Sequence, residues 1–294
     1  MSTALYAFGD DHAPAERLAA RLGLPLHAIS LHRHPDGESL PRIDEAAATA
    51  ILYRALDRPD GKLMPLLLAA DALRRAGATR VVLVAPYMPY LRQDTVFHPG
   101  EPLSRDVIGA VLGQAFDRVV TVEPHLHRTA DLAPVFAGTE VTVLSAADLI
   151  ARRLSLAAGP VVVGPDAESE PWVRHIADEI AMPHLVGSKV RRGDREVAVT
   201  FASAALVQGR RAVIVDDICS SGATLAAATQ ALRAAGAASV EIIVVHDLAR
   251  AGAAAMLHRA GAASFLATDS IGRRANAISL APLLAAALFP EIHR

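Results

Sequence analysis

The fold class is decided by one stretch of the sequence, Val213-Ile214-Val215-Asp216-Asp217-Ile218-Cys219-Ser220-Ser221-Gly222-Ala223-Thr224-Leu225. It predicts a buried apolar strand that ends in two carboxylates, then a loop of small and hydroxyl-bearing residues, and then an alanine-rich helix. Strand, short loop and helix in this order are typical of the βαβ units that build a mostly parallel sheet. The stretch therefore indicates an α/β fold.

The loop in this stretch has the composition of a monophosphate site. Backbone N–H groups at the start of a helix have no partner within the helix, so they can bind an anion. Hydroxyl donors in the loop would add to these amides, and the acids before it can bind a sugar diol or hold Mg²⁺ through water. Alternatively, Asp217 or Ser221 only caps the helix, although a cap needs just one side chain. The candidate residues are Asp216, Asp217, Ser220, Ser221, Gly222, Ala223 and Thr224.

The rest of the chain repeats this alternation of apolar runs of strand length with stretches of helical period rich in Ala and Leu. We therefore expect two similar α/β domains, each a mostly parallel sheet flanked by helices. The predicted strands are 4–8, 50–53, 81–85, 119–122, 161–163, 212–215 and 240–245, and the predicted helices are 63–76, 105–115, 146–154, 223–235 and 280–288.

A short sequence pattern that occurs twice supports two related halves of the chain. Ala72-Leu73-Arg74-Arg75-Ala76-Gly77-Ala78 precedes one predicted strand, and Ala231-Leu232-Arg233-Ala234-Ala235-Gly236-Ala237 precedes another. In both copies the glycine follows the helix, where a left-handed residue costs least. Alternatively, helix, glycine and strand follow one another in any α/β protein. We expect an N-terminal domain of residues 1–144, joined by a C-terminal helix at 280–294, and a C-terminal domain of residues 145–279.

Composition excludes several classes of partner. Lys and Arg number 29 against 31 Asp and Glu, so the net charge is -2 and no global positive field would hold a nucleic acid. The mean hydropathy is +0.30, but the apolar runs are shorter than the ~20 residues that span a bilayer. The single Cys219 cannot form an internal disulfide, and no basic region precedes an apolar one at the N-terminus. We expect a cytoplasmic protein without nucleic acid or membrane partners.

Three further segments accompany the loop, in chain order. Pro35-Asp36-Gly37-Glu38 predicts an acidic turn, Val84-Ala85-Pro86-Tyr87-Met88-Pro89-Tyr90-Leu91-Arg92-Gln93-Asp94 follows a strand, and Thr121-Val122-Glu123-Pro124-His125 ends a strand with histidine. The loop itself resembles the phosphoribosyl-pyrophosphate motif of the type I phosphoribosyltransferase fold. Together the segments resemble the signatures of the ribose-phosphate diphosphokinases, or PRPP synthetases. This resemblance extends from about Arg33 to the C-terminus.

The resemblance implies ATP and ribose 5-phosphate as substrates, Mg²⁺ as cofactor, two phosphoribosyltransferase-like domains, and a homo-oligomer of two or more subunits. It assigns ribose 5-phosphate to the loop and its acids, and it assigns catalytic roles to Lys189 and Arg191 on a flap. The implied ATP-binding residues are Asp36, Gly37, Glu38, Arg92, Gln93 and His125, and the implied metal-binding residues are His125 and Asp166.

These residue types suit the implied roles, although each has a simpler alternative. Arg92 offers a planar fork of donors for phosphate oxygens, or it is a surface residue. Asp36 and Glu38 can accept from the adenine amine, whereas a Pro-Asp-Gly segment is also a common solvated turn. Lys189 and Arg191, two residues apart in extended chain, share one side; a basic hairpin can instead guard a sheet edge.

The implied reaction transfers the β,γ-diphosphoryl group of ATP to the anomeric hydroxyl of ribose 5-phosphate and releases AMP, as a step of nucleotide biosynthesis. Departures from the family pattern are His34 at an aromatic position, Glu168 and Ser169 at paired glycines, and Ala223 at the second loop glycine. A phosphoribosyltransferase, which needs the same loop but no ATP site, and a non-catalytic regulatory paralogue remain alternatives.

Overall fold

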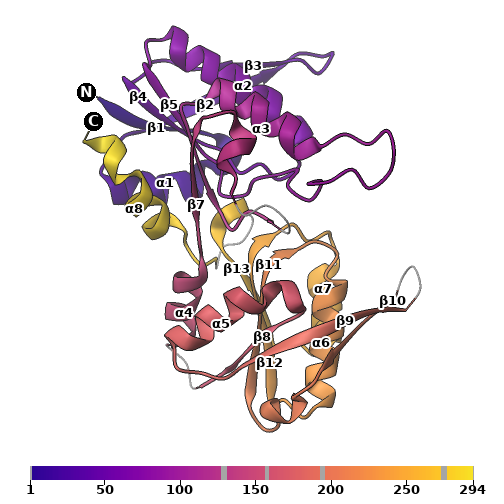
Figure 1. Cartoon of the computed structure of the whole chain (residues 1–294). Coiled ribbons are helices and arrows are strands. Elements are labelled where there is room, and N and C mark those ends of the chain that lie inside the picture. The colour runs from indigo at the N-terminus through magenta and orange to yellow at the C-terminus, as the bar shows by residue number, and fades with distance from the viewer. Residues whose placement is uncertain (1, 127–130, 156–158, 193–195, 273–276, 294) are drawn as a thin grey trace. The chain divides into compact units, whose positions relative to one another are not determined.

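The computed structural model of the chain describes residues 2–126, 131–155, 159–192, 196–272 and 277–293. They form two compact units, each a sheet flanked by helices (Figure 1). No helix within these ranges is both long and apolar enough to cross a membrane. Unit 1 comprises Met1–Leu144, Ser270–Gly272 and Ser279–Arg294, and unit 2 comprises Ser145–Asp269 and Arg273–Ile278.

Unit 1 contains, among its described residues, a seven-stranded sheet in the order β3-β2-β1-β4-β5-β6-β7. Neighbouring strands are parallel except β2 and β3, which form an antiparallel hairpin. The central strands are apolar and buried because helices cover both faces of the sheet. The elements are β1 (Thr3–Phe8), α1 (His12–Leu22), β2 (Leu26–Arg33), β3 (Ser39–Arg42), β4 (Thr49–Tyr53), α2 (Asp60–Arg75), β5 (Arg80–Val84), α3 (Ser104–Ala115), β6 (Arg118–Val122), β7 (Glu140–Leu144) and α8 (Ala281–Ile292).

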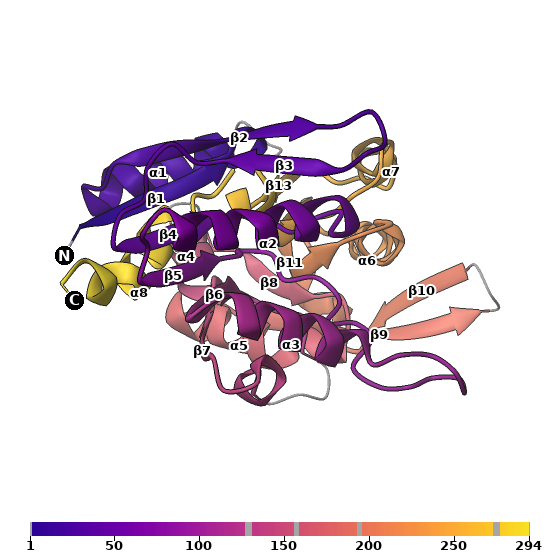
Figure 2. The ribbon, with the colours of Figure 1, turned by 90° about the horizontal axis from the view of Figure 1, so that it is seen from above.

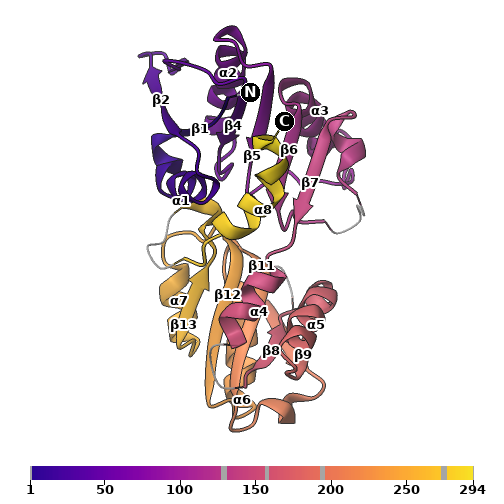
Figure 3. The same cartoon turned by 90° about the vertical axis from the view of Figure 1, so that its left-hand side faces the viewer.

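The direction of each crossover connection decides which face of the sheet its helix covers. From β1 the chain moves one way along the sheet to β2, and from β4 it moves the opposite way to β5 and β6. Because such crossovers are right-handed, α1 covers one face and α2 and α3 cover the other. The C-terminal helix α8 contacts α1 and lies on the same face (Figure 3). The reversal between β1 and β4 is the switch point of this sheet, where open α/β sheets place ligands.

Unit 2 contains, within the described ranges, a six-stranded sheet in the order β10-β9-β8-β11-β12-β13, with its switch point between β8 and β11. The strands are parallel except for the antiparallel hairpin of β9 and β10. The elements are α4 (Ala147–Ser155), β8 (Val161–Gly164), the 3₁₀ turn η3 (Ala167–Ser169), α5 (Glu170–Glu179), β9 (His184–Arg192), β10 (Glu196–Phe201), β11 (Arg211–Cys219), α6 (Ala223–Ala234), β12 (Ser239–Asp247), α7 (Ala253–Arg259) and β13 (Ser264–Ala267).

The two sheets share one topology. In unit 2, β8, β9, β10, β11, β12 and β13 take the places that β1, β2, β3, β4, β5 and β6 have in unit 1. The sequence pattern that occurs twice falls at equivalent points, after α2 and α6. Gly77 and Gly236 there have φ angles of 107° and 87°, which favour glycine. The prediction of two similar α/β domains is confirmed.

All predicted strands and helices are present, but some predicted boundaries differ from the observed ones. The strand predicted to stop before the acid pair continues as β11 to Cys219, because β12 pairs with it as far as Asp247. Asp216 and Asp217 therefore lie within the paired strand and not beyond its end. Lys189 and Arg191 lie in a regular strand, because β9 pairs with β10 from Gly187 to Arg192.

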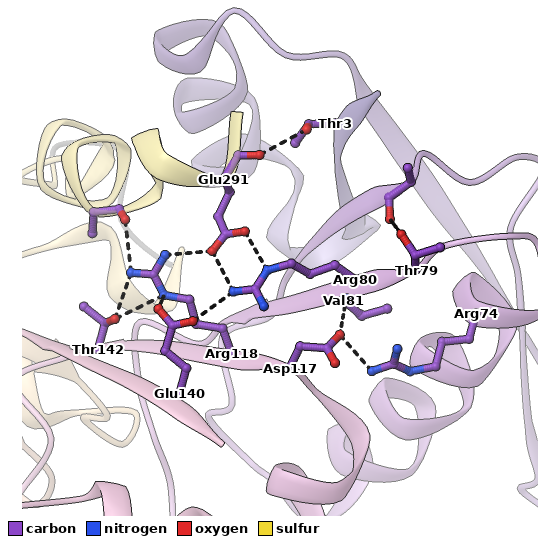
Figure 4. A network of polar contacts seen from close by, with 12 residues as sticks. Thr3, Arg74, Thr79, Arg80, Val81, Asp117, Arg118, Glu140, Thr142 and Glu291 are labelled. Carbon is purple, nitrogen blue, oxygen red and sulfur yellow. Dashed lines mark hydrogen bonds and ion pairs between the residues drawn. The ribbon is translucent and has the colours of Figure 1, made fainter. Parts of the chain in front are cut away.

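A buried ion-pair network lies at the amino-terminal end of β5 and β6 (Figure 4). Glu291 of α8 has no exposed surface and accepts bonds from two arginines. Its Oε2 lies 2.7 Å from Arg80 Nε, and its Oε1 lies 2.9 Å from Arg80 Nη2 and 2.9 Å from Arg118 Nη1. Glu140 pairs with the same arginines but is 44% exposed. The network joins the C-terminal helix to the sheet of unit 1.

A second network occupies the opposite end of this sheet, at the switch point. Arg54, after β4, is 3% exposed, and its Nη1 binds both Asp10 and Asp11, with 2.7 Å to Asp11 Oδ2. Lys62 Nζ lies 2.5 Å from Asp57 Oδ1 and 3.7 Å from Asp10 Oδ2. Burial raises the pKa of the Asp11 carboxyl to about 6, although Arg54 and Lys62 lower it. Charges of this chain therefore fill the switch point of unit 1.

We expect Glu291→Gln to lower the free energy of unfolding by about 3 kcal/mol, because it leaves two largely buried arginines without their shared carboxylate. Glu140→Gln is the matched control, since it removes a carboxylate from the same arginines at an exposed position. It should cost less than about 1 kcal/mol. Urea unfolding followed by circular dichroism measures both. Equal effects of the two substitutions would contradict the anchoring role of Glu291.

We also expect Asp11 to make stability depend on pH. Between about pH 4 and pH 6 the unfolded state loses the Asp11 proton while the folded state keeps it, so stability falls as the pH rises. Relative to Asp11→Asn, the native protein should lose up to about 3 kcal/mol across this window and little above it. Urea unfolding of both proteins at pH 4, 5, 6 and 7 measures the difference. A difference independent of pH would show that the carboxyl is already ionised at pH 4.

Candidate functional site

The loop between β11 and α6 is shaped as an anion site. Ser220 and Ser221 are exposed, and the twelve-residue helix α6 begins directly after Gly222. The described part of the loop offers the first amides of α6 one weak acceptor, Ser221 Oγ, at 3.3 Å from the Ala223 nitrogen. The remaining N–H groups of the first helical turn have no intrahelical acceptor. The loop can therefore bind a phosphate through amides and hydroxyls.

Gly222 is required by its surroundings. Its φ of 81° lies in the left-handed region, and a Cβ there would lie 2.9 Å from Met256 Cε and 3.6 Å from Ala253 Cβ. Helix α7 thus packs against the back of the loop and fixes its path. The sequence pattern did not indicate this contact, because nothing in it relates α7 to the loop.

Three carboxylates gather near the ends of β8 and β11. Burial raises the pKa of the Asp216 carboxyl well above its ordinary value, and the negative charges of Asp217 and Asp166 raise it further. Asp216 Oδ1 accepts a bond from the Asp217 amide at 3.1 Å. Asp216 forms no ion pair with a described basic residue, and its two acidic neighbours disfavour its ionised form.

The donor set suits a hard divalent cation. Mg²⁺ prefers oxygen ligands and keeps several waters, and it is usually bound by one or two carboxylates together with substrate phosphates. Among the described residues, no group of three or more His, Cys, Asp or Glu would hold a metal on its own. The acids at β8 and β11 are therefore compatible with a substrate-bound Mg²⁺ but not with a metal cage made of protein alone.

The β9–β10 hairpin carries the predicted flap cations, and it projects from the sheet of unit 2 (Figure 2). Lys189 is exposed, pairs in the hairpin with Val199, and makes no ion pair with another described residue. The chain has two lysines, and the other, Lys62, belongs to the network of unit 1. Arg191 lies on the same strand, but its side chain is outside the described part of the structure.

The acidic turn predicted in unit 1 joins β2 and β3. Gly37 has a φ of 95°, its amide donates to the His34 carbonyl at 2.9 Å, and the Glu38 amide donates to Asp36 Oδ1 at 3.1 Å. One Asp36 oxygen therefore holds the turn. Glu38 is exposed, and the ring of His34 meets the ring of His32 edge-on, at 4.7 Å between centroids.

The remaining predicted residues of unit 1 follow neighbouring parallel strands. Arg92 and Gln93 come after β5, and His125 comes after β6, so all three lie beyond carboxyl ends of the sheet. Arg92 is exposed, while Gln93 Oε1 accepts a bond of 2.7 Å from Ser104 at the start of α3. His125 is half-buried. β1 and β4 separate this group in the sheet from the hairpin that carries the acidic turn.

Comparison with known proteins gives a consistent family. Residues 4–115 match the N-terminal domain of ribose phosphate pyrophosphokinase, and residues 143–268 match the phosphoribosyl transferase domain. A ribose-phosphate pyrophosphokinase of Methanopyrus kandleri is 30% identical over 92% of this chain and 94% of its own length. That of Aeropyrum pernix is 32% identical over 90% of this chain and 87% of its own length.

The fold agrees with these sequence matches. The crystal structure of phosphoribosylpyrophosphate synthetase from Mycobacterium smegmatis aligns with a TM-score of 0.86 at 26% identity, and the alignment covers 100% of this chain and 99% of that one. The family predicted from the sequence is thereby confirmed. Sequence relatives and fold together show that this chain belongs to the ribose-phosphate pyrophosphokinase family.

Proposed function

We propose that this chain, a transferase, moves the β,γ-diphosphoryl group of ATP to the anomeric hydroxyl of ribose 5-phosphate and releases AMP. The observation that carries the proposal is the juxtaposition in unit 2 of an exposed hydroxyl loop at a helix N-terminus with Asp216 and Asp217. A pentose phosphate has a matching anion and vicinal hydroxyls. The family membership of the whole chain supports the same reaction.

The ribose 5-phosphate site is formed by the loop and the acids before it. Amides and hydroxyls of Ser220, Ser221, Gly222, Ala223 and Thr224 bind the 5-phosphate. The carboxyls of Asp216 and Asp217 bind the ribose hydroxyls. Sugar hydroxyls donate to carboxylates, so ribose hydroxyls would add hydrogen bonds to this pair of acids.

The ATP residues belong to unit 1. Asp36 and Glu38 accept bonds from the adenine amine, while the Gly37 turn presents them. Arg92 and Gln93 bind the phosphates and the nucleoside, with Arg92 supplying a planar pair of donors. His125 of this unit, and Asp166 of unit 2, are each candidate ligands of Mg²⁺, which when bound would neutralise charge on phosphate oxygens.

Transfer requires positioning and charge neutralisation without a covalent enzyme intermediate. The anomeric oxygen attacks the β-phosphorus in line, the bond from that phosphorus to the α,β-bridging oxygen breaks, and AMP departs with this oxygen. The anomeric hydroxyl loses its proton. Lys189 and Arg191 neutralise the charge that grows on the transferred group. The flap also excludes water, which suppresses ATP hydrolysis.

Two alternatives are weaker. A phosphoribosyltransferase would explain unit 2, but it would leave the match of residues 4–115 to a pyrophosphokinase domain without a role. A regulatory paralogue without turnover has no need of an exposed lysine on the hairpin. The assay that separates them incubates the protein with ATP, Mg²⁺ and ribose 5-phosphate and follows phosphorus NMR. AMP and a new anomeric diphosphate are expected; ADP with inorganic phosphate would contradict the proposal.

We also propose that the chain forms a homo-oligomer. Exposed apolar residues recur four positions apart on two helices that contact each other, at Met64 and Leu68 of α2 and at Val107 and Val111 of α3. Such stripes are common where helices meet a partner. Light scattering of the purified chain should give a mass of at least twice 30.9 kDa.

We expect Lys189→Ala to lower kcat at least about a hundredfold, because it removes a cation that stabilises transition-state charge. The affinity for ribose 5-phosphate should change less than twofold, since its site lies on the loop. Arg259→Ala, which removes another exposed cation of unit 2, is the control and should leave kcat within a factor of two. Unchanged kcat in Lys189→Ala would remove the flap assignment.

We expect Gly222→Ala to weaken ribose 5-phosphate binding at least tenfold, because an alanine strained at this left-handed φ of 81° would shift the loop amides that we propose hold the phosphate. Gly252→Ala is a matched control: its φ is 94°, yet nothing lies within 4 Å of the added Cβ. Both variants should lose about 1 kcal/mol of stability from backbone strain. Isothermal titration calorimetry measures the affinity of each variant for ribose 5-phosphate, which should fall only in Gly222→Ala. Equal affinity in the two variants would show that the loop does not bind the phosphate.

A further inference from the structure

The turn after β8, which carries Asp166, is closed by a serine side chain. Ser169 is 8% exposed, and its Oγ donates to the Asp166 carbonyl at 2.6 Å. Its amide donates to the same carbonyl at 3.2 Å. The Asp166 carbonyl therefore holds two bonds from one residue, and the turn is fixed without a ligand.

The same hydroxyl fills the space above Gly164. A Cβ at Gly164 would collide with Ser169 Oγ and lie 3.2 Å from Val173 Cγ2. The absence of a side chain at Gly164 is thus what admits the Ser169 hydroxyl. The two positions therefore depend on each other: a side chain at residue 164 would collide with the Ser169 hydroxyl, and a larger side chain at residue 169 would need the space that Gly164 leaves.

The backbone before this turn lies against the flap strand β9. A Cβ at Gly187 would lie 2.6 Å from the Pro165 carbonyl oxygen and 2.7 Å from Val199 Cγ1. Gly187 of β9 therefore lets the strand approach the backbone directly before Asp166. Lys189 follows two residues later on the same strand, so one close contact joins the base of the flap to this turn.

We infer that Ser169 and Gly187 are positioning residues: together they fix the Pro165–Asp166 segment, and so the place of the Asp166 carboxylate near Asp216. This inference rests on the proposed function, in which Asp166 is a candidate ligand of Mg²⁺. The Ser169 hydroxyl supplies the hydrogen bond that holds the turn in place before a metal binds.

The first test is metal affinity, with Mn²⁺ as a paramagnetic probe that favours the same oxygen ligands as Mg²⁺. Free Mn²⁺ is measured by electron paramagnetic resonance in the presence of ribose 5-phosphate. Ser169→Ala should bind Mn²⁺ roughly threefold to tenfold more weakly, the usual range for one hydrogen bond. Ser155→Ala is the control, because Ser155 Oγ makes a similar 2.8 Å bond to the Arg152 carbonyl at the end of α4.

The second test separates positioning from folding. Gly164→Ala should lower the melting temperature, because the added Cβ collides with the Ser169 hydroxyl. The double variant Gly164→Ala/Ser169→Gly removes this collision and should recover most of the lost melting temperature. The double variant should nonetheless bind Mn²⁺ as weakly as Ser169→Ala. If it instead recovers native Mn²⁺ affinity, the hydroxyl is only a packing element and the inference is wrong.

The outcomes distinguish this inference from the proposed function. A native protein that binds Mn²⁺ but forms no AMP contradicts the proposed function alone. Native Mn²⁺ affinity in Ser169→Ala, or no Mn²⁺ binding by the native protein, overturns the positioning role. Steady-state kinetics add a further readout: Ser169→Ala should raise the Mg²⁺ concentration for half-maximal rate while the KM for ribose 5-phosphate changes less than twofold.

Discussion

Repulsion among neighbouring carboxylates is the constraint on which our interpretation of unit 2 depends. Desolvation raises the pKa of the Asp216 carboxyl, and the negative charges of Asp217 and Asp166 raise it further. Like charges held close together disfavour each other's ionised form. A ligand that donates hydroxyls or brings a cation would relieve this repulsion, which is why we propose that a sugar and Mg²⁺ bind at this end of the sheet.

In unit 1 the acids at the equivalent switch point are paired with an arginine of the same unit. Its switch point also places acids after a strand, at Asp10 and Asp11, but Arg54 enters from the neighbouring strand and binds both. The guanidinium also stacks on Phe8, at 4.3 Å from the ring centroid. Charges of the chain therefore meet at the switch point of unit 1. At the equivalent point of unit 2 we propose that a ligand binds.

Sequence reasoning succeeded where local pattern and burial coincide. The strands at Val81 and Val240 were predictable because they are apolar on both faces, and the loop at Ser220–Thr224 because its residue types are informative in themselves. β2 and β9 were not predicted because they mix polar and apolar residues, each next to the edge strand of its sheet. The contact of Ser169 with Gly164 could not be predicted, since it depends on how a 3₁₀ turn folds back. The sequence does show two acids, Asp10 and Asp11, after a strand. Their partner Arg54 is distant in sequence, so the ion pairs could not be predicted.

The use of lysine in this chain is informative because arginine supplies nearly all other positive charge. Lys62 reaches a carbonyl and a carboxylate at once, with its Nζ 2.8 Å from the Ala55 oxygen and 2.5 Å from Asp57. A compact ammonium suits that convergence better than a planar fork. Lys189 has no such fixed partners among the described residues. A point charge on a flexible stem can follow a phosphoryl group as it moves between two oxygens, whereas a guanidinium is best at binding a fixed pair. Both lysines thus lie where a compact charge close to its partner oxygens matters more than the fixed hydrogen-bond directions of a guanidinium.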